Sequence, residues 1–87
     1  LRVNVKGLFD KSRSFNYMNI KEKIGQRIKA ARKDLGLSRQ ALANLTAGIS
    51  GSAINNYERG ERTPGPQEIE ELGKHLNVSP SYLMGFT

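Results

Sequence analysis

The sequence predicts an all-α fold of five helices. Apolar residues recur at helical spacing in successive segments, which places them on one face of each helix. Residues that favour helix starts, such as serine, asparagine and proline, precede these segments, and glycines follow several of them. The only strand-like alternation is weak and lies at Leu1, Val3 and Val5, before the first helical segment. We therefore expect helices packed around one small core.

The first predicted helix covers residues 20–35. Asn19 precedes it and Glu22 follows three residues later, which is the pattern of a capping box. Gly36 is expected to end the helix, because glycine tolerates a left-handed backbone conformation. The residues expected to face the core lie at helical spacing: Ile24, Ile28, Ala31 and Leu35.

The second predicted helix starts after Ser38, a favoured N-cap residue. Leu42 and Leu45 are expected to face inward, and Ala43 is small enough to let another helix approach closely. Gly48 lies where the chain must turn sharply, and glycine adopts a positive φ at little cost.

The third predicted helix runs from residue 50 or 51 to residue 58, with Ile54 and Tyr57 as its apolar residues. Its other side chains are small and polar, so little of that face needs burial: Ser52, Ala53, Asn55 and Asn56. Two short helices joined by a glycine-bearing turn form the layout of a helix-turn-helix, which places one helix in the DNA major groove.

Two further helices complete the predicted fold. The fourth begins near Pro66, a residue suited to a first helical turn, and its acidic residues lie where the helix dipole favours them. The fifth is short: Ser79 caps it, Pro80 opens it, and residues 82–86 supply apolar groups. The buried stripe expected for the fourth helix is Ile69, Leu72 and Leu76.

Composition limits the function. The 87 residues carry a net charge of +6, which favours a polyanionic partner such as DNA, RNA or an anionic membrane. Cysteine is absent, His75 is the only histidine, and Ser52 has no base near it in sequence. We therefore expect no enzyme, no cofactor and no metal site. No apolar run approaches the roughly 18 residues needed to span a bilayer, so a cytoplasmic protein is expected.

The chain is expected to divide into a basic N-terminal extension, residues 1–17, and a DNA-binding domain, residues 18–87. Met18 looks like a natural start, so we interpret the extension as upstream, vector-derived or cleaved sequence. It is either a basic arm that follows a DNA groove or a disordered tail, and the tail is the favoured interpretation.

Residues 20–86 resemble the Cro/repressor-type helix-turn-helix family. Three segments carry the resemblance together with the turn glycine: LSRQALA, INNYERGERTP and LNVSPSYLMG. The resemblance implies a five-helix fold like that of lambda repressor. It also implies a lambdoid phage repressor whose DNA-binding domain precedes a self-cleaving, dimerising C-terminal domain. One departure concerns the turn: Ala43 and Ile54 are eleven positions apart, where the family usually has ten.

The resemblance implies base contacts from the third helix, at Gly51, Ser52, Asn55 and Asn56. An asparagine amide can match the N6 and N7 edge of adenine, and a serine hydroxyl can donate or accept at several bases. Gly51 has no side chain, so a contact there is lost or becomes a close backbone approach. The alternative is that the asparagines are ordinary exposed polar residues.

The resemblance also implies phosphate contacts from residues on both sides of the third helix. Such contacts give affinity and orientation but little sequence choice. The alternative is that Arg59 and Arg62 pair with Glu61 or face water. The expected residues are Arg39, Gln40, Arg59, Arg62 and Thr63.

Arg32 and Glu58 look like the family's ion pair that joins the first helix to the end of the third. A bidentate contact between guanidinium and carboxylate would hold the recognition helix on its scaffold. Glu58 is then structural, which suits an acid that phosphates would repel.

Three functions remain at this point. The favoured one is a transcriptional repressor that binds a pseudo-palindromic, double-stranded DNA operator as a homodimer. The second is a protein-interaction module, such as an antitoxin or a bridging factor, suggested by the apolar end of the chain at residues 82–86. A nonspecific binder of nucleic acid or membranes is the least favoured.

Overall fold

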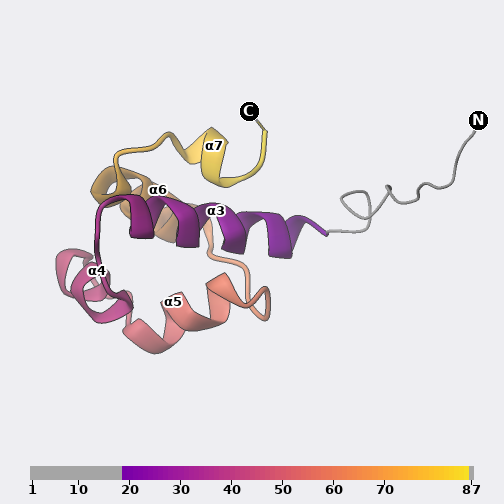
Figure 1. The fold of residues 1–87 in the computed structure, drawn as a ribbon. Helices are drawn as coiled ribbons and strands as arrows, with labels where there is room; N and C mark the ends of the chain where they lie inside the picture. The colour runs from indigo at the N-terminus through magenta and orange to yellow at the C-terminus, as the bar shows by residue number, and fades with distance from the viewer. Residues whose placement is uncertain (1–18, 87) are drawn as a thin grey trace, which may run out of the picture.

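The computed structural model describes residues 19–86, and the predicted extension of residues 1–17 lies outside this part. The described residues form helices and no strand, which confirms the all-α prediction (Figure 1). None of these helices is long and apolar enough to cross a membrane. The five helices are α3 (Ile20–Asp34), α4 (Arg39–Leu45), α5 (Gly51–Glu58), α6 (Pro66–Leu76) and α7 (Pro80–Leu83).

Local capping explains where the helices begin. The Asn19 side chain accepts from the Glu22 amide, and the Glu22 carboxylate accepts from the Asn19 amide, so the predicted capping box is present. A serine hydroxyl accepts from the third helical residue at α4, α5 and α7. At its C-terminal end, α6 is terminated by Asn77, which adopts the left-handed conformation more usual for glycine.

Helix α3 is the centre of the arrangement. In Figure 1 it runs between α4 and α5 on one side and α7 on the other, with α6 behind it. It packs directly on α5, α6 and α7, while α4 packs on α5 and α6 on α7. The helix-turn-helix, α4 and α5, is therefore held on one side of α3. Helices α6 and α7 pack on α3 and on each other and complete the core.

The core contains most of the predicted apolar residues, but two expectations were wrong. Leu35 is 48% exposed because α3 has already ended at Asp34, so its side chain leaves the buried face. Leu45, the last residue of α4, is 50% exposed, and Ile49 from the following turn is buried instead. No burial was predicted for Phe86, which lies beyond the end of α7 at Leu83 and is 72% exposed.

Gly25 marks the closest approach between α3 and α5. A Cβ atom built on Gly25 would lie 2.2 Å from the carbonyl oxygen of Tyr57 and 2.9 Å from that of Glu58. Both obstructing atoms belong to the α5 backbone, so a side chain here would push the helices apart. The role of Gly25 could not be predicted from the sequence, because a glycine inside a helix reveals nothing about the neighbour that it meets.

Candidate nucleic-acid interface

Helix α5 has one buried face and one accessible polar face. Ala53, Ile54 and Tyr57 are buried in the core. Ser52 is exposed and Asn55 and Asn56 are partly exposed, as a 3.6-residue period requires when residues 53, 54 and 57 point inward. The predicted base-contacting residues therefore lie together on the accessible face of one helix.

Gly51, at the start of α5, is covered in part by a side chain from α4. A Cβ atom at Gly51 would lie 3.0 Å from Gln40 Oε1. Gln40 Nε2 donates to Asn44 Oδ1 at 3.0 Å, so this side chain is held along α4. The structure thus brings Gln40, predicted to contact phosphate, beside Gly51, predicted to contact bases.

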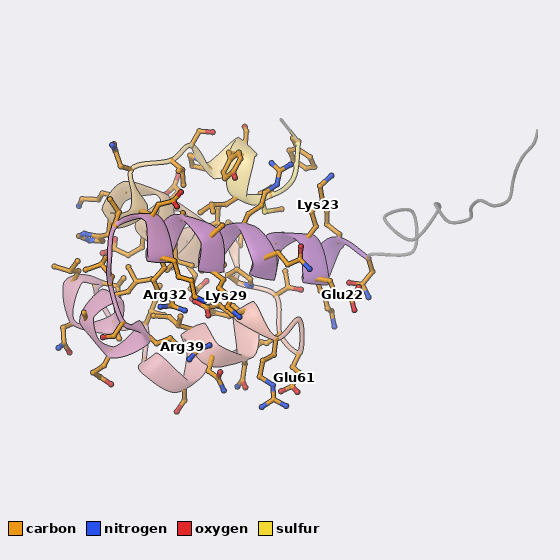
Figure 2. The ribbon with its side chains drawn as sticks, viewed as in Figure 1. Glu22, Lys23, Lys29, Arg32, Arg39 and Glu61 are labelled. Carbon is orange, nitrogen blue, oxygen red and sulfur yellow. The ribbon has the colours of Figure 1, made fainter. Side chains whose placement is uncertain are left out.

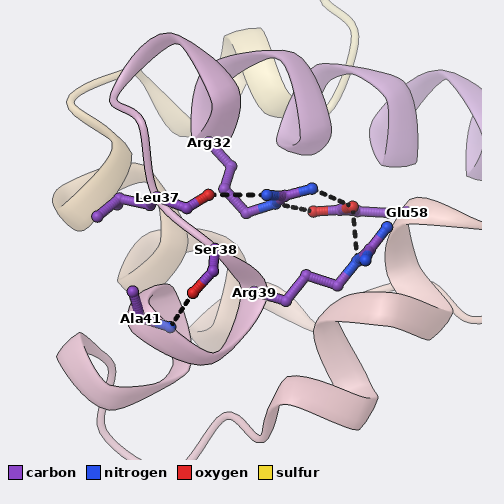
Figure 3. A network of polar contacts seen from close by, with 6 residues as sticks. All are labelled: Arg32, Leu37, Ser38, Arg39, Ala41 and Glu58. Carbon is purple, nitrogen blue, oxygen red and sulfur yellow. Dashed lines mark hydrogen bonds and ion pairs between the residues drawn. The ribbon is translucent and has the colours of Figure 1, made fainter.

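A buried carboxylate joins α5 to both α3 and α4 (Figure 3). Arg32 Nε donates to Glu58 Oε2 at 2.6 Å, and Arg32 Nη2 donates to Glu58 Oε1 at 2.9 Å. Arg32 Nη1 donates to the Leu37 carbonyl oxygen at 2.7 Å. The exposed fractions of the Arg32 and Glu58 side chains are 7% and 1%. This bidentate contact fastens the end of α5 to α3.

Arg39 adds a second cation to the same carboxylate. Its Nε donates to Glu58 Oε1 at 3.0 Å, and its side chain remains 41% exposed. In Figure 2, Arg39 and Arg32 approach the same region between α3 and α5. The hydrogen bonds that Arg32 donates to the Glu58 carboxylate raise the pKa of Arg32. Sequence reasoning assigned Arg39 to phosphate alone and missed this tie to Glu58.

The loop after α5 carries two more arginines. Arg59 Nη2 lies 2.8 Å from Glu61 Oε2, and both side chains are more than half exposed. The Arg62 guanidinium carbon lies 5.7 Å from the centre of the Tyr57 ring, a cation–π distance. Burial raises the pKa of Tyr57, and the nearby charge of Arg62 opposes that shift. Thr63 is exposed beside them.

Taken by position, the predicted contact residues lie on α4, on α5 and in the loop that follows α5. The Glu58 network fixes α4 and α5 to the same side of α3. Within residues 19–86, no group of three or more histidine, cysteine, aspartate or glutamate side chains is placed to hold a metal ion. The accessible side chains of this surface offer hydroxyl and amide groups for hydrogen bonding, flanked by guanidinium groups.

Comparison with known proteins identifies the family. The family model described as Helix-turn-helix matches residues 28–83. Repressor protein C2 of Salmonella phage P22 is 39% identical over 61 residues, which cover 70% of this chain and 28% of that repressor. The chain thus spans less than a third of the length of this relative.

Two solved structures share the fold. The P22 c2 repressor in complex with synthetic operator 9T superposes with a TM-score of 0.69 at 38% identity, covering 74% of this chain and 96% of that one. The restriction-modification controller protein C.AhdI from Aeromonas hydrophila superposes with a TM-score of 0.67 at 35% identity. The match covers 72% of this chain and 94% of that one. On the family match, the sequence identity and these folds, the chain belongs to the helix-turn-helix family.

Proposed function

We propose that this chain is the sequence-specific DNA-binding part of a transcriptional repressor of phage type. It binds a double-stranded operator with α5 in the major groove. The observation that carries the proposal is the accessible polar face of α5, Ser52, Asn55 and Asn56, on a helix anchored by a buried ion pair. The similar P22 c2 repressor, solved on a synthetic operator, supports DNA as the partner.

The role of each residue follows from the hydrogen-bonding or charged group of its side chain and from its position on or beside α5. Asn55 and Asn56 read base edges, and Ser52 adds a hydroxyl contact nearer the start of α5. Arg39, Arg59 and Arg62 neutralise phosphates on either side, with Gln40 and Thr63 as neutral phosphate contacts. Gly51 lets the backbone at the helix start approach the DNA closely. Two copies bind as a homodimer on a pseudo-palindromic site.

Selection from a randomised duplex pool at roughly physiological salt tests this proposal. Enrichment of an inverted repeat, with half-sites about one helical turn apart, is the expected result. Absence of enrichment, combined with binding that disappears as salt rises, would contradict sequence-specific recognition. The bound fraction should be sequenced at two salt concentrations, since nonspecific binding depends strongly on salt.

An apolar groove supports a second function, binding to another protein. It lies between the start of α6 and α7 and has a volume of about 300 Å³. A protein-interaction module would retain its partner after Arg39, Arg59 and Arg62 are changed to glutamine. A repressor would lose its operator under the same changes. The groove is lined by Pro64, Pro66, Ile69, Glu70, Pro80 and Met84.

A further inference from the structure

The turn between α4 and α5 is tied to a helix outside the helix-turn-helix. The amide of Ala47 donates to Glu71 Oε2 at 3.0 Å, a contact between residues 24 positions apart in sequence. His75 Nε2 lies 3.0 Å from the same oxygen, one helical turn further along α6. One carboxylate oxygen of α6 therefore contacts both the turn and the His75 ring.

The hydrogen bond between Ala47 and Glu71 joins an exposed residue of the turn to α6. α4 packs on α5 and α6 on α7, and both pairs meet chiefly through α3. Within the turn, Thr46 Oγ1 donates to the Ala43 and Ile49 carbonyl oxygens, which fixes the first residue after α4. The next residue, Ala47, is exposed, and Gly48 follows with φ at +87°. The Glu71 contact is thus placed at the exposed part of the connection that sets where α5 begins.

Neighbouring groups favour the ionised form of Glu71. The Ala47 amide is the main cause of a pKa below the usual range for this carboxyl group, followed by its hydrogen bond with His75. The Lys74 charge acts in the same direction. The acceptor is therefore a carboxylate at neutral pH, and hydrogen bonds to ionised acceptors are stronger than neutral ones.

We propose that Glu71, oriented by His75, is a positioning residue for DNA recognition: by holding the Ala47 amide it sets the placement of α5 relative to the rest of the domain. This inference rests on the proposed function, since it concerns the helix that reads the operator. Neither residue need touch DNA, because the effect is transmitted through the turn.

The change Glu71→Ala separates an effect of net charge from an effect of α5 placement, because the two predict opposite changes in operator affinity. Removing an acid makes the domain more basic, so charge alone predicts equal or tighter binding to any DNA. Loss of the tie predicts operator binding weaker by about three- to tenfold, the scale of one hydrogen bond, with nonspecific binding unchanged or tighter. Glu70→Ala is the matched control, because it removes the same charge from an exposed neighbour on α6. Glu71→Gln keeps an acceptor oxygen and should recover most of the affinity.

Hydrogen exchange of the Ala47 amide tests the tie without DNA. In Glu71→Ala this amide should exchange about three- to tenfold faster, while Glu70→Ala leaves it unchanged. Unchanged Ala47 exchange, or equal losses of operator and nonspecific binding, would overturn the positioning role. If the unaltered chain selects no operator, the proposed function fails, and the exchange experiment still reports on the tie by itself.

Discussion

We expect base recognition in this domain to depend on two adjacent side-chain amides. Asn55 and Asn56 lie on the accessible side of α5, opposite the buried Ile54 and Tyr57. Each amide presents a donor and an acceptor with the spacing of an adenine edge. We therefore expect sequence specificity to come from these two side chains, and affinity to come from the arginines around them.

Changing Asn55 or Asn56 to alanine should weaken operator binding and spare nonspecific binding. A good bidentate base contact contributes about 1–3 kcal/mol, so the operator Kd should rise by about 5- to 150-fold. Titration of each variant with the selected operator and with an unrelated duplex measures the difference. Gln67→Ala removes an exposed amide from α6 and serves as the control. Equal weakening on both duplexes would contradict base reading.

The Glu58 carboxylate is expected to matter for stability more than any exposed acid. In Glu58→Gln the Arg32 charge remains buried without its anion, and breaking a buried pair in this way costs about 3–5 kcal/mol. Urea unfolding measures that loss. Glu61→Gln is the matched change at an exposed pair with Arg59, and it should alter stability by no more than about 1 kcal/mol. Similar losses in the two variants would show that burial of the pair has no energetic consequence.

At the scale of elements, the contact between α3 and α5 depends on the missing side chain of Gly25. The helices approach so closely that the α5 carbonyl groups occupy the space of a Cβ atom. The Arg32–Glu58 pair lies across the same two helices. A small residue and a buried ion pair therefore cooperate to seat the recognition helix.

Gly25→Ala should destabilise the fold even though alanine is the better helix former. The new methyl group meets backbone atoms that cannot rotate away, which costs about 1–3 kcal/mol or more. Gly51→Ala is the control, because the only tight contact of its Cβ is with the flexible end of Gln40, and its effect should stay within about 1 kcal/mol. Thermal unfolding of both variants distinguishes them. A stabilised Gly25→Ala variant would refute the close approach.

At the scale of the whole molecule, positive charge is expected to act through a few placed arginines. Arg59→Gln and Arg62→Gln should weaken the salt dependence of operator binding. The plot of log binding constant against log salt concentration should become less steep by about 0.9 for each lost phosphate contact. Lys74→Gln removes an equal charge from α6 and should leave the slope unchanged. Operator titrations at several salt concentrations supply the slopes. An equal change for Lys74→Gln would mean that net charge, not placement, governs binding.

The helices, their caps and the order of the helix-turn-helix could be predicted from the sequence, because these features depend on residues three or four positions apart. Asn19 with Glu22 and Ser38 with Ala41 are such local pairs, and the structure contains both contacts. The burial of Ile49 in place of Leu45 became evident only from the packing of the helices. The same packing revealed that Gly25 meets the α5 backbone and that Arg39 and Glu71 contact distant partners. Those outcomes depend on how helices distant in sequence pack, and no local periodicity encodes that.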